Sequence, residues 1–504
     1  MPSKSVITVY LDHVIGEITS NIYGHFIEHL GGCIYPGIWV GEESKVPNED
    51  GLRKDLLTAL KRINPPVIRW PGGCFADHYH WEDGVGPQDQ RPRRVNLSWG
   101  GEESNEFGTD EFLSFCSKVG AEPYICVNVG SGSPSEAYYW IEYCNGKGDT
   151  YHAKLREKYG HPESYGVKYW GVGNENWGCG GFFDPVYYAW EYRRFAGFMN
   201  RVSREIKLIA CGWQEEWNLK LMEELRNYLN FIDYLSIHYY FGQGRYGGDL
   251  EFTDDDYYRL LIDIQYLEYE IKRAIDIIDS FAGERKDIRI AVDEWGTWYP
   301  QANFESGLYQ QSTLRDAILA ASVLNLFNNY SRKVVMANIA QMVNVLQSLF
   351  LTKDDKVVLT PTYHVFDMYK SHMKNDALKI KVEAPIVLEL ERPRRGPQRS
   401  PPIKLEPLYA INASASLQKG ERLILTVTNT LLDSEMEVKV QIKGEKEVNN
   451  GRATLLTAIN VREHNDFSFP ERVTLTEKGI DAKGQSFTYV APPHSVNTLT
   501  IKLK

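Results

Sequence analysis

Short apolar runs alternate with helix-like segments from about residue 20 to about residue 380 of this 504-residue chain. This alternation is typical of repeated β-α units, in which helices cover a sheet of parallel strands. Eight strand candidates can be distinguished, namely residues 22–29, 66–73, 122–130, 167–175, 206–212, 233–240, 288–294 and 333–341. Eight such units predict a closed (β/α)8 barrel of the TIM type, which belongs to the α/β class.

The segments between the strand candidates carry the periodicity and the end signals of helices. One helix face with i, i+3, i+4, i+7 spacing is formed by Leu314, Ala317, Ile318 and Ala321. Thr109 is a candidate N-cap for the helix that follows it, and Gly120 is a candidate stop for the same helix.

After about residue 384 the pattern changes to alternating strands such as 422–429 and 497–504, separated by Gly, Asn, Asp and Pro. These strands predict an antiparallel, jelly-roll-like β-sandwich. The opening strand 5–12 is expected to join it. We therefore expect a barrel domain of residues 18–384 and a sandwich domain formed by residues 1–17 together with 385–504.

The charge of the chain restricts the classes of partner. A net charge of −11 argues against a nucleic-acid-binding protein and against adhesion to an acidic membrane. The basic, proline-rich segment 392–402 is therefore interpreted as a solvated loop and not as a nucleic-acid-binding arm. Neither a signal-peptide core nor a run of about 18 apolar residues is visible, so we expect a cytoplasmic protein.

Polar residues are dense at the ends of the predicted barrel strands, where the active site of such a barrel lies. They are Glu28, Arg69, Asn128, Asn174, Glu175, His238, Tyr240, Asp293, Glu294 and Gln341. Glycoside cleavage requires two carboxyl groups: one protonates the leaving oxygen, and the other attacks the anomeric carbon or activates water. Glu175 and Glu294 end the fourth and seventh strands, almost opposite each other, and are the candidate pair.

An isolated Glu is most often a solvated surface charge. The surroundings of these two favour a functional role instead. Glu175 lies in GVGNENWGCGG, where glycines let the chain approach a ligand and Trp177 can face a sugar. Glu294 ends an apolar strand and is followed by Trp295.

Longer stretches around these residues resemble family 51 of the glycoside hydrolases, the α-L-arabinofuranosidases. The matching stretches span nearly the whole predicted barrel and are YGHFIEHLGGCIYPGIW, RWPGGCFADHYHWEDGVGP, NEFGTDEF, WGVGNENWG, SIHYY, VDEWGTWY, LYQQSTLRDAILAA and ANIAQMVNVLQ. The resemblance implies an exo-acting, retaining hydrolase of terminal α-L-arabinofuranosyl residues in arabinoxylan, arabinan or derived oligosaccharides. It also implies a homo-oligomer, by analogy a hexamer. We expect no cofactor and no metal.

The resemblance also implies a role for each strand-end residue that matches the family. Glu294 would be the nucleophile, and Glu175 would be the general acid and then the general base. Asn174 would hydrogen-bond the 2-hydroxyl of the sugar. Arg69 and Tyr240 would hold and polarise the nucleophile, since a fixed cation lowers the pKa of a neighbouring carboxyl.

Further contacts with the substrate are expected around the mouth of the barrel. Glu28 and Gln341 would bind sugar hydroxyls, as the resemblance implies. Trp99, Trp298 and Tyr299 follow barrel strands in loops, where their rings can stack on a polysaccharide backbone or pack within the loops.

Cys74 is a departure from the family pattern, because many members carry Asn after the Pro-Gly-Gly turn. Any hydrogen bond from the side chain of that Asn to the sugar is therefore not expected here. Cys74 is kept as a candidate substrate-binding residue with a different contact. Cys74 and Cys179 leave the same face of the barrel and can form a disulfide if their loops cross strand three. Two separate reduced thiols, which suit a cytoplasmic protein, are the other possibility.

The sequence admits three other interpretations. HFIEH (25–29) matches an inverted zinc-protease motif, but the glycines around it disfavour the helix that such a motif needs. A non-catalytic carbohydrate-binding barrel is possible in principle, because a fold does not determine function. β-Xylosidases and endo-glucanases share the same catalytic pair and differ in the shape of the pocket.

Overall fold

The computed structural model describes residues 3–390, 394–395 and 402–504. Its first part is a closed barrel of parallel strands, which confirms the predicted (β/α)8 architecture. Each barrel strand overlaps one of the eight strand candidates. The strands are β2 (Gly24–Phe26), β5 (Val67–Trp70), β8 (Glu122–Val127), β9 (Tyr169–Val172), β10 (Lys207–Ala210), β11 (Tyr234–Gly242), β12 (Arg289–Trp298) and β13 (Val334–Ala340).

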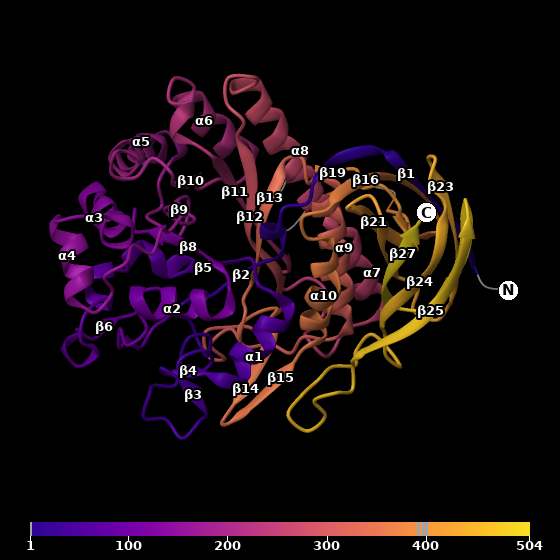
Figure 1. The fold of residues 1–504 in the computed structure, drawn as a ribbon, viewed down its shortest axis with the longest axis horizontal. Helices are drawn as coiled ribbons and strands as arrows, with labels where there is room; N and C mark the ends of the chain where they lie inside the picture. Colours follow the sequence, from indigo (N-terminus) through magenta and orange to yellow (C-terminus); the bar gives the residue numbers. More distant parts are fainter. Residues whose placement is uncertain (1–2, 391–393, 396–401) are drawn as a thin grey trace.

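Helices surround the barrel on its outer side (Figure 1). They are α1 (Lys54–Ile63), α2 (Thr109–Val119), α3 (Pro134–Asn145), α4 (Tyr151–Lys158), α5 (Pro185–Val202), α6 (Glu215–Leu225), α7 (Asp254–Ile262), α8 (Ile264–Phe281), α9 (Leu314–Asn329) and α10 (Pro361–Tyr369). Short hairpins also decorate the loops: β3 (Asn48–Glu49) with β4 (Leu52–Arg53), β6 (Arg94–Val95) with β7 (Glu102–Glu103), and β14 (Phe350–Lys353) with β15 (Lys356–Leu359).

The ends of α2 differ in part from the expectation. Gly120 stops the helix in a left-handed conformation with φ of 78°, as predicted. The N-cap, however, is Gly108 and not Thr109, which is the first helical residue. The backbone N–H of Gly108 donates to the Glu111 carboxylate at 2.8 Å, and the Thr109 hydroxyl instead accepts a hydrogen bond from the Trp140 indole.

The second part is a nine-stranded sheet that closes on itself around its own apolar core. In spatial order the strands are β1 (Ser3–Glu17), β16 (Asp376–Glu383), β21 (Ile411–Gln418), β22 (Arg422–Asn429), β27 (Ser495–Leu503), β24 (Val448–Leu456), β25 (Leu475–Gly484), β26 (Ser486–Ala491) and β23 (Met436–Lys443). All neighbouring pairs are antiparallel except β1 and β23, which run parallel. The predicted C-terminal sheet domain is therefore present, with one parallel pair that the sequence did not indicate.

The boundary expected at residue 384 is wrong by one strand. β16 pairs with β1 over seven residue pairs, so the sheet domain begins at Asp376. The segment follows α10 and a short 3-10 turn, and Asn375 and Asp376 are the only separator residues at its start, without Gly or Pro. This weak separation did not indicate a domain boundary before residue 384.

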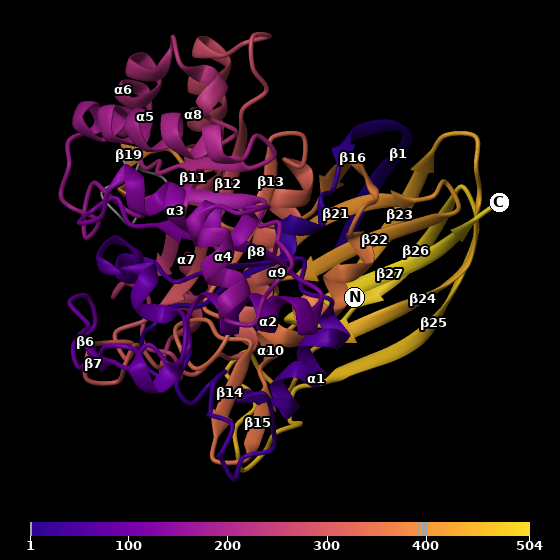
Figure 2. The same cartoon turned by 60° about the vertical axis from the view of Figure 1, so that its left-hand side comes forward.

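Helices α9 and α10 lie between the barrel and the second sheet (Figures 1 and 2). Every residue of α9 from Leu314 to Asn328 is buried, because one side of the helix contacts the barrel and the other contacts the sheet. Polar side chains on the sheet side are paired across the junction. Asn325 donates to Asn412 at 2.7 Å, and Asn328 donates to Ser414 at 3.0 Å.

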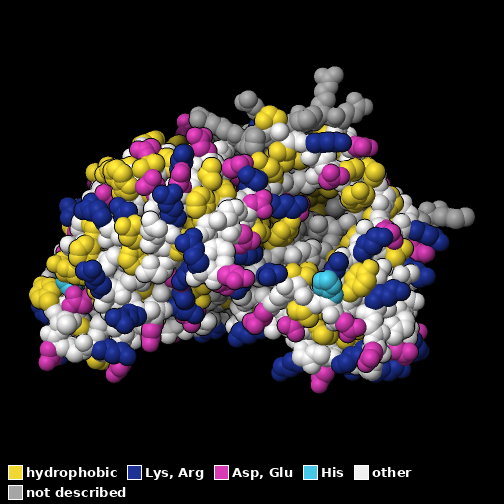
Figure 3. Space-filling model, turned by 90° about the horizontal axis from the view of Figure 1, so that it is seen from above, with side chains coloured by type: hydrophobic (Ala, Val, Ile, Leu, Met, Phe, Trp, Pro, Cys, Tyr) yellow, Lys and Arg dark blue, Asp and Glu magenta, His cyan; other side chains and the backbone are white. Residues whose placement is uncertain are grey.

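The described surface carries mixed charge. On the face shown in Figure 3, the visible Lys and Arg side chains are interspersed with Asp and Glu side chains and do not form one basic area. Most of the basic segment interpreted as a loop, residues 392–393 and 396–401, lies outside the described residues. Among the described helices, none combines the length and the apolar character needed to cross a bilayer.

Candidate active site

A pocket of about 560 Å³ opens at the C-terminal ends of the barrel strands. Its lining contains eight of the site residues predicted from the sequence: Glu28, Cys74, Trp99, Glu175, Tyr240, Glu294, Trp298 and Gln341. Trp177, which the sequence indicated as able to face a sugar, also lines the pocket. The other lining residues were not among those predictions: Leu30, Gly73, Gly178, Phe182, Trp213, Gln243, Leu308 and Leu346. The polar groups thus lie among apolar and aromatic side chains, as is usual for a small-ligand site.

Glu175 and Glu294 face each other across this pocket. One carboxyl oxygen of each residue and a ring nitrogen of His238 lie within 4.8 Å of one another. Retaining glycosidases hold their carboxyl groups about 5–5.5 Å apart, whereas inverting enzymes need about 6.5–9.5 Å to admit a water molecule. The separation therefore suits the retaining mechanism.

Both oxygens of Glu294 are held by neighbouring side chains. Arg69 donates to Oε1 at 2.8 Å, and the hydroxyl of Tyr240 donates to Oε2 at 2.7 Å. The second terminal nitrogen of Arg69 donates to Oδ1 of Asn174 at 2.6 Å. Arg69 is buried, so its charge acts on Glu294 with little solvent screening. The arrangement fixes the carboxyl group of Glu294 in a single orientation beside the Arg69 guanidinium.

Glu175 has a different environment. Burial raises its pKa, and the hydrogen bond from His238 at 2.9 Å lowers it in part. Burial alone would lower the pKa of His238. The charges and hydrogen bonds of Glu294, Asp293 and Glu175 outweigh burial and raise this pKa to about 10. His238 is therefore a cation at neutral pH. Its role was not predicted, although the sequence placed it at a strand end.

Asp293 holds His238 through the ring nitrogen that does not bind Glu175. One of its oxygens lies 3.3 Å from Nε2 of His238, and the other lies 3.6 Å from Nε of Arg69. The hydroxyls of Ser236 and Tyr124 also donate to this carboxylate. Burial raises the pKa of Asp293, but Arg69 and His238 outweigh that effect and lower it to about 2. Asp293 is thus a permanent anion that orients the two cations of the site.

We expect His238→Asn to move the alkaline limb of the kcat/KM profile upward by about one pH unit. The cation stabilises the ionised form of Glu175, so its removal raises the pKa of Glu175, and the acid stays protonated to higher pH. The measurement is a pH profile with a glycoside whose leaving group needs a proton. His80→Asn, at a half-exposed histidine paired with Glu136, is the matched control. If the alkaline limb of the profile stays in place or moves to lower pH, His238 does not stabilise the ionised form of Glu175.

Four buried polar atoms in or beside the pocket have no hydrogen-bond partner among the described residues. They are Nδ2 of Asn174, whose oxygen is bound to Arg69, Oε1 of Gln341, whose nitrogen donates to Glu28 at 3.0 Å, and the indole nitrogens of Trp177 and Trp213. A buried unpaired polar group costs about 1–3 kcal/mol. Three donors and one acceptor are therefore left for the polar groups of a ligand.

Glu28 lies against the Gly72–Gly73 turn, where an added Cβ would come within 2.8 Å of its carboxylate. Burial and the nearby Glu294 raise its pKa to about 7. The backbone N–H of Phe75 donates to Glu28 at 3.0 Å, and the Trp99 indole donates at 2.9 Å. The carboxyl group is thus held rigidly at the wall of the pocket.

Four tryptophans line the pocket, whereas Tyr299 does not. Trp99 and Trp298 line the pocket, and so do Trp177 and Trp213, whose rings stack at 4.4 Å. The stacking role considered for Tyr299 is wrong: this residue is buried, and its hydroxyl donates to Asp316 at 2.9 Å. Trp213 was missed, although its position just after the fifth strand was a usable signal.

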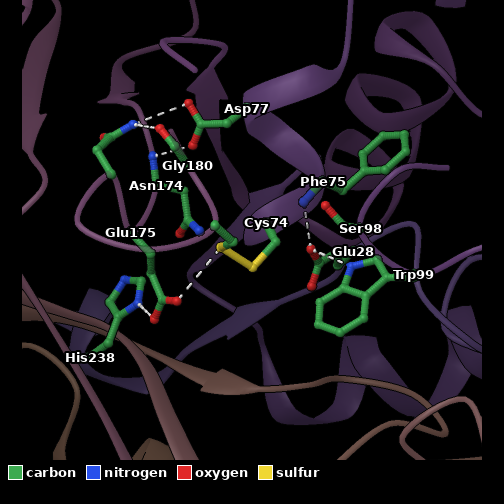
Figure 4. The surroundings of a disulfide bond; sticks show 12 residues. Glu28, Cys74, Phe75, Asp77, Ser98, Trp99, Asn174, Glu175, Gly180 and His238 are labelled. Atoms are coloured by element: carbon green, nitrogen blue, oxygen red, sulfur yellow. Dashed lines mark hydrogen bonds and ion pairs between the residues drawn. A yellow bond between two sulfur atoms is a disulfide. The ribbon is translucent and has the colours of Figure 1, made fainter. Parts of the chain in front are cut away.

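Cys74 and Cys179 are joined by a disulfide in the structure, with their Cα atoms 5.5 Å apart (Figure 4). The bond connects the loop after β5 to the loop after β9. The sulfur of Cys179 lies 3.8 Å from Oε2 of Glu175. Cys74 lines the pocket, so the disulfide presents an apolar surface beside the carboxyl pair.

The zinc-protease interpretation of HFIEH is contradicted by the local structure. The motif begins in strand β2 and not in a helix. His25 is fully buried against the ring of Phe366, and burial lowers its pKa to about 3. His29 binds Glu103 at 2.8 Å and accepts a hydrogen bond from the Trp70 indole.

A (β/α)8 barrel with two carboxyl groups at this spacing, one after strand four and one on strand seven, defines the class of retaining glycoside hydrolases. Two family models match the chain. They are described as the α-L-arabinofuranosidase 1 domain, at residues 59–258, and the α-L-arabinofuranosidase C-terminal domain, at residues 293–495. The chain belongs to the family 51 α-L-arabinofuranosidases.

Individual relatives agree over almost the whole length. An intracellular exo-α-L-arabinofuranosidase of Bacteroides ovatus is 42% identical over 93% of this chain and 90% of its own. The crystal structure of the family 51 arabinofuranosidase of Xanthomonas axonopodis pv. citri is 36% identical, with a TM-score of 0.92, and covers 99% of this chain and 100% of its own. An arabinose complex of the Thermotoga maritima enzyme has the same identity and coverage and a TM-score of 0.89.

Proposed function

We propose that this enzyme releases terminal α-L-arabinofuranosyl residues by double displacement, with Glu294 as nucleophile and Glu175 as acid/base. The observation that carries the proposal is the difference between the environments of the two carboxyl groups. Glu294 is held by hydrogen bonds from Arg69 and Tyr240 to its two carboxyl oxygens. Glu175 is buried, with a raised pKa, at a distance that suits retention.

In the first step, Glu294 attacks the anomeric carbon, and the bond from that carbon to the leaving oxygen breaks. Glu175 gives its proton to this oxygen, so the leaving group departs as a neutral alcohol. In the second step, Glu175 takes a proton from water while the water oxygen attacks the anomeric carbon. Glu294 then departs as a carboxylate, and the free arabinose retains its configuration.

The unpaired atoms of the pocket suit a furanose. Nδ2 of Asn174 would donate to the 2-hydroxyl, a contact that can strengthen in the transition state. Glu28 and Oε1 of Gln341 would bind other hydroxyls. The apolar side of the ring would contact the Cys74–Cys179 disulfide.

The deciding experiment compares three substrates: 4-nitrophenyl α-L-arabinofuranoside, 4-nitrophenyl β-D-xylopyranoside and a soluble β-glucan. We expect kcat/KM to be highest for the arabinofuranoside by a wide margin. A higher value for the xyloside or the glucan would favour the β-xylosidase or endo-glucanase alternative. Binding of arabinose without turnover would favour a non-catalytic barrel. Release of arabinose alone from arabinoxylan and arabinan, with their backbones left intact, tests the exo mode.

Trp99→Ala and Trp298→Ala are expected to lower kcat/KM about three- to tenfold more on branched arabinoxylan oligosaccharides than on an aryl arabinoside. Both rings line the pocket, and stacking on the leaving sugar would be lost. Trp99→Phe keeps a ring but removes the hydrogen bond to Glu28, and so separates the two contributions. Trp190→Ala, at a half-exposed tryptophan on α5, is the control. Equal losses on both substrates reject the stacking role.

We also propose a cytoplasmic location and a homo-oligomer, a hexamer by analogy with the family. The location is supported by the word intracellular in the name of the Bacteroides ovatus relative. A hexamer has six times the mass of the 57.8 kDa chain, which light scattering of the purified protein measures directly.

A further inference from the structure

One buried carboxylate connects the loops that surround the candidate acid. Asp77 lies in the 3-10 turn Cys74–His78, which follows β5, and only 5% of its surface is exposed. Its Oδ1 accepts hydrogen bonds from the backbone N–H groups of Val129 at 2.9 Å and Gly130 at 2.7 Å. Its Oδ2 accepts from the backbone N–H of Asn174 at 2.8 Å. No cation pairs with it among the described residues, so backbone N–H groups and the side chain of Asn176 hold this carboxyl group.

The residue after Asn174 has an unusual backbone. Glu175 has a φ of +42°, a left-handed conformation that glycine favours and that costs other residues about 1–3 kcal/mol. Such a conformation persists only where the surrounding structure determines it. The backbone just before Glu175 is fixed by the hydrogen bond from Asn174 to Asp77.

The backbone after Glu175 is fixed by the same turn. The side-chain nitrogen of Asn176 donates to Asp77 at 3.3 Å and to the carbonyl of Gly180 at 2.6 Å. Gly180 packs so closely that an added Cβ would lie 2.6 Å from Asp77. The Cys74–Cys179 disulfide then joins the two segments covalently (Figure 4). One turn thus holds the acid/base loop on both sides of Glu175.

We propose that Asp77 is a positioning residue for the acid/base, and that the disulfide is a second tether between the same two segments. Asp77 does not line the pocket, so it acts through the conformation of Glu175 and not through contact with the sugar. Its carboxylate holds the backbone that aims Glu175 at the leaving oxygen. This inference rests on the proposed function, in which Glu175 is the acid/base.

The test uses Asp77→Asn, which keeps the size of the side chain but turns an amide N–H toward backbone N–H donors. A displacement of about 1 Å in a catalytic group can cost 10²-fold. We therefore expect kcat/KM to fall about 10- to 100-fold on methyl α-L-arabinofuranoside, whose leaving group needs the acid. On 2,4-dinitrophenyl α-L-arabinofuranoside, whose leaving group needs no proton, kcat/KM is expected to stay within about threefold. Azide is expected to raise kcat on the second substrate.

Two further variants separate positioning from general destabilisation. Asp110→Asn changes another buried carboxyl group, which accepts hydrogen bonds from Tyr143 and Tyr165 and does not line the pocket. It is expected to lower the Tm without any dependence on the leaving group. Asn176→Ala, used if Asp77→Asn does not fold, removes the contacts to Asp77 and Gly180 and is expected to show the leaving-group dependence.

The second tether is tested by Cys74→Ser/Cys179→Ser and by reducing the wild-type enzyme with dithiothreitol. Both are expected to show the same leaving-group dependence as Asp77→Asn, to a smaller extent. Equal losses on the two substrates in Asp77→Asn, without azide rescue, overturn the positioning role. If the wild-type enzyme is inactive on aryl arabinofuranosides, or if Glu175→Ala lacks the leaving-group dependence, the proposed function itself has failed.

Discussion

Glu294→Ala is expected to lower kcat/KM about 10⁴-fold or more on every arabinofuranoside, whatever its leaving group. The variant removes the atom that forms the covalent intermediate, so a better leaving group cannot compensate. It also leaves Arg69 and Tyr240 without their shared partner. The loss is measured by steady-state kinetics with methyl and 2,4-dinitrophenyl α-L-arabinofuranosides in parallel.

The anomeric configuration of the azide product tests the role of Glu294. In Glu294→Ala, azide can enter the vacated space and displace dinitrophenolate directly, which inverts the anomeric centre and gives the β-azide. Glu284→Ala, at an exposed glutamate outside the pocket, is the matched control and should behave as the wild type does. Formation of the α-azide by Glu294→Ala would show that the nucleophile is another residue.

Glu175→Ala is expected to separate the two substrates. On the methyl arabinofuranoside, kcat/KM should fall about 10²- to 10⁴-fold, because the leaving alkoxide receives no proton. On the dinitrophenyl substrate the first step needs no acid and should proceed at close to the wild-type rate. Water then attacks the intermediate slowly, so a burst of one dinitrophenolate per active site is expected before slow turnover.

Azide completes this second test. It needs no general base, so in Glu175→Ala it should attack the covalent intermediate, raise kcat and give the α-azide, with net retention. The two variants should therefore yield opposite anomers from the same substrate. If Glu175→Ala gives the β-azide, or if no burst precedes turnover, the assigned roles are incorrect.

The barrel could be predicted because parallel strands are buried on both faces and appear as continuous apolar runs. All eight runs became strands. The junction between the domains could not be predicted in the same way. β16 follows the barrel after only a short 3-10 turn, and its pairing with β1, far away in the sequence, and with β21 assigns it to the sheet.

Within the site, the sequence identified residues whose position at a strand end coincides with a distinctive motif, such as Glu175 and Glu294. It did not show how their environments differ, because this depends on neighbours from other strands. The charge of His238 depends on Asp293 and two glutamates. Asp77 was overlooked because a buried carboxylate that binds backbone N–H groups leaves no mark in local sequence.

The pairing of β1 has a consequence for synthesis on the ribosome. β1 ends at Glu17, whereas its partners β16 and β23 begin at Asp376 and Met436. β1 therefore has to wait, unpaired, until both partner strands have been translated. Long-range pairing of this kind is slow and leaves strand edges exposed to association with other chains. Lys4 and Asp12 flank the uncharged residues 5–11 of this strand, and charges at such positions disfavour its association with other chains during the delay.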